Sequence, residues 1–395
     1  MKTPLRLLTS LLFVCLAAAS CSTGVPEPSP SVPSVSPVDP DATPETRDLL
    51  RRLHAREGKG ILFGHQHDLS MGFTFDTGDG NASDTLAAVG DHPAVFGWDS
   101  LVLDGDEAPG KPDATPEANA EVLTRMFKQA DALGGVNTLT MHLPNPVTGG
   151  DFYDTSGDAV AAVLPGGARH SDLTARLDRV ADAVAGARRP DGTLIPMILR
   201  PWHERNGDWF WWGAGHATDQ QYVELFRFTV DYLRDERGLH NLLYAYSPNS
   251  PLNAGPGTYL VGYPGDDHVD ILGYDSYDET GGGQEWLRSV TADLAAVVGL
   301  ADERGKVPAW TEFGPYEDTE PDPHWFTSVL EALKADQNAS RIAWMLTWAN
   351  YGHGDREHAY VPYPAHGDHP EHPLLADFQV FHDDPSTVFA KEWKR

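Results

Sequence analysis

The stretch from residue 196 to residue 213 places proton-transferring groups directly after a short apolar run. Residues 195–199 are mostly apolar, and Arg200, His203 and Glu204 follow them. Four aromatic residues then occupy positions 209–212. A carboxylic acid can protonate a glycosidic oxygen, and an indole face suits the apolar face of a sugar. The pattern therefore favours cleavage of a glycosidic bond beside indole faces, with Trp211 and Trp212 as part of the wall.

Ordinary glycoside hydrolysis needs a second carboxyl group. Glu312 is the best partner for Glu204, because it directly follows the apolar run 307–310. Its rivals near the same position are Glu317, Asp275 and Asp278. A separation of about 5–5.5 Å between the two carboxyl groups would indicate a retaining enzyme, and about 6.5–9.5 Å an inverting one.

Short apolar runs alternate with helical patterns along the chain. The predicted strands are Gly60–Phe63, Ala94–Trp98, Asn137–Leu143, Pro196–Arg200, Leu242–Tyr246, Val269–Tyr274, Val307–Thr311 and Ile342–Thr347. The predicted helices are Glu45–Glu57, Pro116–Leu133, Asp172–Ala187, Asp219–Glu236, Gln284–Arg304 and Trp325–Asp336. Eight strands with helical crossovers predict an α/β fold of the (β/α)₈ TIM barrel type. A doubly wound sheet is the alternative, but no Gly-rich phosphate fingerprint follows the first strand.

In a barrel of this kind, the ends of the strands build the active site. Polar and aromatic residues cluster at those ends, with His142 at the end of the third strand, Tyr274 at the end of the sixth and Trp348 after the eighth. Strand four contributes Arg200, a cation that would favour the ionised form of Glu312. Glu204 must instead be protonated, which burial among indoles and a nearby carboxylate would favour.

The composition narrows the classes of function. The 395 residues include 58 acidic and 29 basic ones, a net charge of −29, which disfavours nucleic acid as a partner. Both cysteines, Cys15 and Cys21, lie near the N-terminus, so the rest of the chain has neither a disulfide nor a thiolate metal site. We expect a monomer without a cofactor or metal, acting on a neutral glycan.

Residues 1–21 resemble a secretory signal, with Lys2 and Arg6 before an apolar core. Ala18–Cys21 resembles a bacterial lipobox, in which Cys21 would be lipidated; plain cleavage with release is the alternative. Residues 22–44 are rich in Pro and Ser, which predicts an extended tether. Residues 45–395 are predicted to form the single catalytic domain. We expect an extracytoplasmic protein attached to the cell membrane only through that N-terminal lipid anchor.

Three motifs resemble glycoside hydrolase family 26, the β-mannanase family. They are Arg-Pro-Trp-His-Glu-x-Asn-Gly-x-Trp-Phe-Trp-Trp-Gly from Arg200, Phe-Gly-His-Gln from Phe63, and Trp-Thr-Glu-Phe-Gly from Trp310. The resemblance implies a (β/α)₈ barrel and a retaining endo-β-1,4-mannanase. By the same resemblance Glu204 is the acid/base and Glu312 the nucleophile. The resemblance also implies six substrate contacts, which are His142, Arg200, His203, Trp209, Tyr274 (bonded to the nucleophile) and Trp348.

Several alternatives stay open at this point. An exo-acting mannobiohydrolase, a β-glucanase or a β-xylanase would fit the same residues, and so would a non-catalytic polysaccharide-binding lipoprotein. The histidines between positions 353 and 372 match no compact metal motif. Residues 76–84 resemble a calcium loop but lack its closing bidentate Glu.

Overall fold

The computed structural model describes residues 35–76, 80–252, 255–353 and 356–394. The predicted signal segment 1–21, with Cys21, and most of the predicted tether lie outside these residues. Within the described residues no helix has the length and apolar character needed to cross a membrane.

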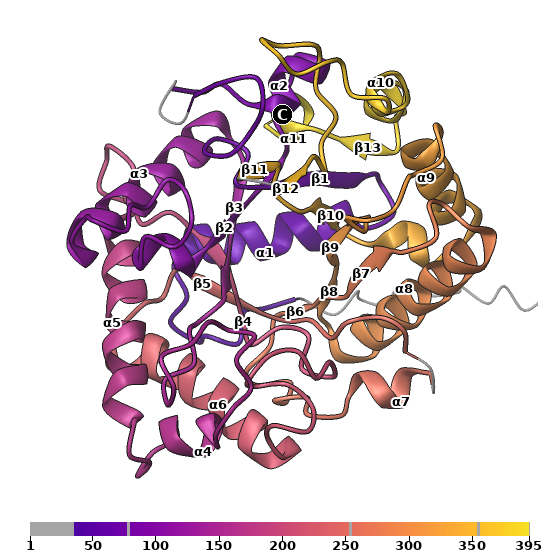
Figure 1. Ribbon diagram of the computed structural model, residues 1–395. Helices are drawn as coiled ribbons and strands as arrows, with labels where there is room; N and C mark the ends of the chain where they lie inside the picture. Colours follow the sequence, from indigo (N-terminus) through magenta and orange to yellow (C-terminus); the bar gives the residue numbers. More distant parts are fainter. Residues whose placement is uncertain (1–34, 77–79, 253–254, 354–355, 395) are drawn as a thin grey trace, which may run out of the picture. The chain divides into compact units, whose positions relative to one another are not determined.

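A closed ring of parallel strands forms the centre of the fold (Figure 1). The strands are β1 (Ile61–Gln66), β2 (Val95–Asp99), β3 (Val136–Met141), β4 (Met197–Pro201), β5 (Leu242–Tyr246), β6 (Ile271–Leu272), β7 (Asp275–Asp278), β8 (Val307–Pro308), β9 (Trp310–Pro315) and β10 (Trp344–Thr347). The pairs β6–β7 and β8–β9 are each one barrel strand in two pieces. Since β6 pairs with β8, β7 with β9, β9 with β10 and β10 with β1, the sheet closes. The predicted (β/α)₈ barrel is confirmed.

Most helices cover the outside of this ring (Figure 1). The longer ones are α1 (Pro44–Arg56), α3 (Pro116–Leu133), α5 (His170–Gly186), α6 (Asp219–Asp231), α8 (Gln284–Arg304), α9 (Trp325–Ala335) and α10 (Leu375–Asp383). Threonines begin three of them: Thr43, Thr115 and Thr218 each accept a backbone N–H of the first turn. These seven include all six predicted helices, with each end displaced by at most five residues.

Shorter elements complete the fold. They are α2 (Asp84–Val89), α4 (Ala159–Val163), α7 (Pro256–Tyr259), α11 (Ala390–Trp393), the 3₁₀ turns η1 (Ser100–Leu103) and η3 (Ala339–Arg341), the π-helical turn η2 (Tyr232–Glu236), the hairpin β11 (Tyr351–His353) with β12 (Arg356–His358), and β13 (Thr387–Val388).

Helix α1 closes the amino-terminal end of the barrel. Its Leu49, Leu50 and Leu53 are buried against the first residues of the strands, among them Leu62 and Leu243. With this end plugged by apolar side chains, the opposite end, where the strands finish, is the one open to a ligand.

The compact unit begins at Val35, inside the stretch assigned to the tether. The Val38 N–H donates to Asp270 at 2.7 Å, and Asp39 pairs with His240 at 2.9 Å. Ala42 is buried. Residues 35–43 therefore belong to the barrel, because their polar groups find partners there and their small apolar side chains are covered.

Candidate active site

The turn after β4 carries a strained backbone at Glu204. Trp202 has a φ of 55° and Glu204 a φ of 54°, in the left-handed region that side chains larger than glycine rarely adopt. Neighbours fasten this turn: the Glu204 N–H donates to the Ser247 carbonyl at 2.7 Å, and the Tyr222 hydroxyl donates to the Trp202 carbonyl at 2.7 Å. Strain of this kind concentrates at functional sites, where surrounding contacts hold it in place.

The carboxyl group of Glu204 is buried close to other carboxyl groups. Glu204 is only 8% exposed. Burial raises the pKa of Glu204 well above its usual value, and the negative charges of Asp275 and Glu312 raise it further. The Trp209 indole N–H donates to Glu204 Oε2 at 2.8 Å, which opposes that rise in pKa. The environment thus suits a carboxylic acid that holds its proton until it is needed.

The carboxyl group of Glu312, on β9, has the opposite surroundings. Arg200 donates from Nη2 to Oε1, and the Tyr277 hydroxyl donates to Oε2 at 2.7 Å. His203 Nε2 lies 3.9 Å from Oε1. A cation and a hydroxyl donor both favour the carboxylate over the carboxylic acid. The buried carboxyl groups at the ends of β4 and β9 therefore have contrasting hydrogen-bond donors, an indole N–H for Glu204 and a guanidinium with a hydroxyl group for Glu312.

Arg200 links three strands beneath these carboxyl groups. Nη1 donates to Asp275 Oδ2 and Ser247 Oγ, both at 3.0 Å, and Nη2 also donates to Thr140 Oγ1 at 3.1 Å. Burial raises the pKa of Asp275 to about 7, although the positive charge of Arg200 opposes this rise. One guanidinium thus serves two carboxyl groups, those of Asp275 and Glu312.

Two histidines form one wall of the site, and their pKa values shift in opposite directions. His142 Nδ1 lies 2.6 Å from Asp99 Oδ2. Burial lowers the pKa of His142, but the Asp99 carboxylate more than offsets this effect, and the pKa is raised overall. Burial, then the charges of Arg200 and His142, lower the pKa of His203 well below its usual value. The pKa values of these neighbouring rings therefore shift in opposite directions, and the His142 ring stands edge-on to that of His203, with ring centroids 4.5 Å apart.

Aromatic rings surround the two histidines. The Trp348 ring lies 5.8 Å from that of His142, and Phe210 contacts both histidines. Trp211 and Trp212 are buried and donate their indole N–H groups to the carbonyls of Leu143 and His203. The prediction that this tryptophan pair forms wall is confirmed.

The structure brings together all but one of the predicted site residues. The residues that meet at the carboxyl ends of the strands are Glu204, Glu312, His142, Arg200, His203, Trp209 and Trp348. The prediction for Tyr274 was wrong. Its hydroxyl donates to Asp293 on α8 at 2.7 Å, outside the barrel. Tyr277 donates to Glu312 instead.

The register of β7 explains that error. Asp275 stands opposite Glu312 in the pairing of β7 with β9. Side chains alternate along a strand, so Tyr274 faces outward next to the inward Asp275, and Tyr277 returns to the side of Asp275. Alternation around Asp275 was the signal in the sequence that could have identified Tyr277.

Other polar clusters have structural partners. The carboxylate of Asp84 accepts the backbone N–H groups of Phe73 and Thr74 and the amide of Asn350, which fastens this loop to the end of β10. No group of three or more His, Cys, Asp or Glu side chains able to hold a metal occurs among the residues that the structure describes.

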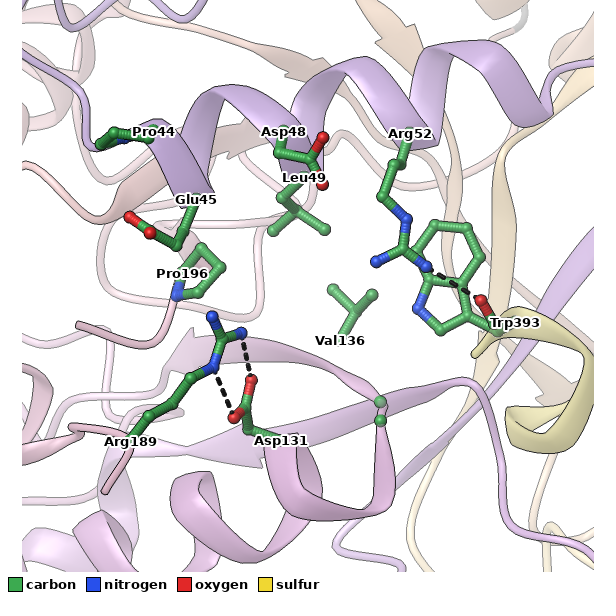
Figure 2. A pocket seen from close by; sticks show the side chains of 12 residues that line it. Pro44, Glu45, Asp48, Leu49, Arg52, Asp131, Val136, Arg189, Pro196 and Trp393 are labelled. Carbon is green, nitrogen blue, oxygen red and sulfur yellow. Dashed lines mark hydrogen bonds and ion pairs between the residues drawn. The ribbon is translucent and has the colours of Figure 1, made fainter. Parts of the chain in front are cut away.

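A hollow of about 500 Å³ lies at the other end of the barrel, beside α1 (Figure 2). Arg189 makes two hydrogen bonds to Asp131, at 2.7 and 2.9 Å. The Arg52 guanidinium lies 3.9 Å from the centroid of the Trp393 ring. Both arginines are thus paired with groups that line the hollow. Since the strands end at the opposite pole of the barrel, this hollow takes no part in the site.

Residues 38–351 match the model of glycosyl hydrolase family 26. The chain is 42% identical over 373 residues to a mannan endo-1,4-β-mannosidase of Bifidobacterium adolescentis, covering 91% of this chain and 36% of that protein. It thus spans about a third of that relative. It is also 30% identical to a mannan endo-1,4-β-mannosidase of Bacillus subtilis, covering 67% of this chain and 73% of that protein.

Solved structures show the same fold at similar identity. A modular endo-β-1,4-mannanase from Cellulomonas fimi is 49% identical with a TM-score of 0.85, covering 91% of this chain and 78% of that one. The catalytic domain of an endo-β-1,4-mannanase from Bacillus sp. JAMB-750 is 42% identical with a TM-score of 0.87. The latter match covers 91% of this chain and 96% of that chain.

Proposed function

The chain belongs to glycosyl hydrolase family 26, and on that premise we propose that it cleaves internal β-1,4-mannosidic bonds with retention of anomeric configuration. One observation supports this above all. Burial and neighbouring negative charges raise the pKa of Glu204, while the Glu312 carboxyl group accepts hydrogen bonds from Arg200 and Tyr277. Relatives named as endo-β-1,4-mannanases support the choice of substrate.

In the first step, a carboxylate oxygen of Glu312 attacks the anomeric carbon of the bound sugar. The bond from that carbon to the glycosidic oxygen breaks, and Glu204 gives its proton to the departing oxygen. The product is an ester between the sugar and Glu312. Tyr277 and Arg200 hold the attacking carboxylate in place, and His142, His203 and Trp348 contact the reacting sugar.

In the second step, Glu204 acts as a base. Ester formation removes the negative charge of Glu312, which is one of the causes of the raised pKa of Glu204. Glu204 then accepts a proton from water while the water oxygen attacks the anomeric carbon. The ester bond breaks, the Glu312 carboxylate is restored, and Glu204 is again protonated. The two inversions give net retention.

Replacement of each glutamate tests these roles. Glu204→Gln should lower kcat for mannan by about 10²- to 10⁴-fold, and Glu312→Ala by at least as much. Glu317→Gln is the matched control, because this exposed glutamate lies five residues from Glu312. Its activity should stay within twofold of the parent. Near-parental activity in Glu204→Gln or Glu312→Ala would refute the assignment.

Azide rescue on an aryl mannoside separates the two roles. In Glu204→Ala, azide should attack the glycosyl ester and give a β-mannosyl azide. In Glu312→Ala, azide should replace the missing nucleophile and give the α-anomer. The same anomer from both variants would overturn the division of roles.

Substrate and mode of attack need a separate assay. Mannan, mixed-linkage glucan and xylan should be compared by reducing-sugar release, and we expect release from mannan to dominate. A product profile on mannohexaose should show internal cleavage into several sizes at early times. Mannobiose as the sole early product would indicate an exo-acting enzyme instead.

We also propose that Cys21 carries a lipid that keeps the enzyme at the cell surface, on the strength of the small residues that precede it. Cys21→Ser should move the protein from the membrane fraction to the medium. Equal membrane association of the two forms would refute the anchor.

A further inference from the structure

The carboxyl group of Asp99 lies on the inner side of the barrel and has no role in the catalytic scheme. Asp99 is the last residue of β2 and is 0% exposed. The preceding Trp98 points outward, because its ring packs against Phe127 of α3 at 6.4 Å, so Asp99 points inward. Taking a carboxyl group out of water costs free energy unless partners compensate for it. The partners of Asp99 therefore indicate what it does.

Both oxygens of Asp99 are hydrogen-bonded, and His142 is the main partner. Oδ2 lies 2.6 Å from His142 Nδ1, and Oδ1 accepts the His142 N–H at 3.4 Å. Oδ1 also accepts the Leu101 N–H at 2.9 Å. The Ser100 hydroxyl donates to the His142 carbonyl at 3.2 Å. The end of β2 thus holds both the ring and the backbone of His142, while Leu101 keeps the carboxyl group itself in place.

This contact decides which nitrogen of His142 is left for a ligand. An ionised carboxylate accepts hydrogen bonds and donates none, so His142 Nδ1 carries a proton and donates to Asp99. Every hydrogen bond that the described residues make to the His142 ring goes to Nδ1. The rings of Phe152, His203 and Trp348 lie around it, with centroids 4.6, 4.5 and 5.8 Å away. The direction of the ring is therefore fixed, and Nε2 remains for a ligand.

The carboxyl groups around His142 favour a second proton on its ring. Burial lowers the pKa of His142, but the charge and the hydrogen bond of Asp99 raise it. The charges of Glu312 and Glu107 add to this rise, and the pKa is raised overall. An asparagine in place of Asp99 would remove the nearest carboxyl group and leave the other two. The pKa of His142 should then fall.

We propose that Asp99 is a positioning residue for the reaction, which fixes the His142 ring so that Nε2 faces the sugar whose bond is cleaved. This inference rests on the proposed function, because it takes that sugar to be the unit that becomes joined to Glu312. Asp99 is buried and does not touch the sugar, so it acts through His142.

A double-mutant cycle on mannohexaose tests whether Asp99 acts through His142. Asp99→Asn keeps the size of the side chain, but its amide can donate to Nδ1 and so favour the other tautomer of the ring. It should lower kcat/KM about 10- to 100-fold, as expected for the loss of a hydrogen bond to a charged group. In the His142→Ala background the same change should alter kcat/KM less than threefold, because the group on which Asp99 acts is gone.

Asp377→Asn is the matched control for this cycle. Asp377 is likewise buried, at 5% exposed, and it accepts the Phe326 N–H at 2.7 Å at the start of α9, outside the barrel. Activity of this variant should stay within twofold of the parent.

Nitrogen NMR of histidine-labelled protein without substrate gives a readout that does not depend on activity. The His142 signals are identified by their loss in His142→Ala. In the parent, Nδ1 should carry a proton at both pH 5 and pH 8. In Asp99→Asn the midpoint of the His142 titration should move to lower pH, because the carboxylate that raises the pKa is gone.

The outcomes separate this inference from the function on which it rests. Hydrolysis of mannohexaose by the parent reports on the proposed function alone. Parental kcat/KM in Asp99→Asn would overturn the role of Asp99. A loss of equal size in the His142→Ala background would also overturn it, because Asp99 would then support the barrel in general. An unprotonated Nδ1 in the parent would overturn it even if Asp99→Asn failed to fold.

Discussion

Replacing Arg200 by methionine should destabilise the barrel by a definite and pH-dependent amount. Arg200 is 2% exposed and pairs with Asp275 and Glu312, which are 0% and 4% exposed. Methionine fills a similar volume without a charge. The substitution leaves two buried carboxyl groups near one another with no cation between them.

The size of the effect follows from this arrangement. Removing one partner of a buried ion pair costs about 3–5 kcal/mol of the free energy of unfolding. Unfolding entropy is about 2.1 cal/mol/K per residue, which gives about 0.75 kcal/mol/K for the unit Val35–Arg395. The melting temperature should therefore fall by about 4–7 °C.

The dependence on pH has a fixed sign. The pKa of Asp275 is about 7, above its usual value, and burial is the main cause. Below that pH the carboxyl group is neutral, and leaving it without Arg200 costs less. As pH rises through 7, the group ionises and the loss grows. The deficit should be larger at pH 8 than at pH 5.

Calorimetry at pH 5 and pH 8 provides the measurement, with Arg205→Met as the matched control. Arg205 is also buried, but its partner Asp219 has a side chain that is 61% exposed. Losing that pair should cost at most about 1 kcal/mol, or about 1–2 °C. A second variant, Arg200→Met with Asp275→Asn, should regain part of the loss at pH 8. The reasoning is refuted if Arg200→Met is no less stable than Arg205→Met at pH 8, or if its deficit is larger at pH 5.

Two further predictions concern the carboxyl groups themselves. Tyr277→Phe removes a hydrogen bond of 2.7 Å to Glu312, worth about 1.5–3 kcal/mol, and should lower kcat/KM by about tenfold or more. The Tyr274 hydroxyl bonds to Asp293 instead, so Tyr274→Phe should keep kcat/KM within twofold. Equal losses in the two variants would contradict the assignment of Tyr277, rather than Tyr274, as the donor to Glu312. Trp209→Phe removes the N–H that lowers the pKa of Glu204. Since Glu204 must be protonated to act, the alkaline limb of the pH profile should move to higher pH, and a move to lower pH would contradict the assignment.

The barrel and most of its site could be predicted because the sequence shows where each strand ends. Apolar runs stop where polar residues begin, and the closed parallel sheet brings those ends together at one pole, as with Arg200 and Glu204 after β4 and Glu312 on β9. It was harder to predict from the sequence which side chains of a strand face the inside of the barrel. The sixth strand is broken between Leu272 and Asp275, so an apolar run could not show which of Tyr274 and Tyr277 faces inward.

Contacts made by loops were the least accessible from the sequence. Asp99 holds His142 from the next strand, and Tyr153 reaches Phe210 across some sixty residues. Neither pairing has a period or a spacing that a sequence would reveal.

The backbone at Glu204 shows how fold and chemistry constrain one another. A regular continuation of β4 would direct alternate side chains into the barrel and outward. Left-handed conformations at Trp202 and Glu204 break this alternation within three residues, so that Arg200, His203 and Glu204 all reach one site. Such conformations cost of order 1–3 kcal/mol each. The Trp202 indole donates to Thr229, and Ser247 accepts the N–H of Glu204, so residues of α6 and β5 help to hold a turn that β4 alone would not adopt.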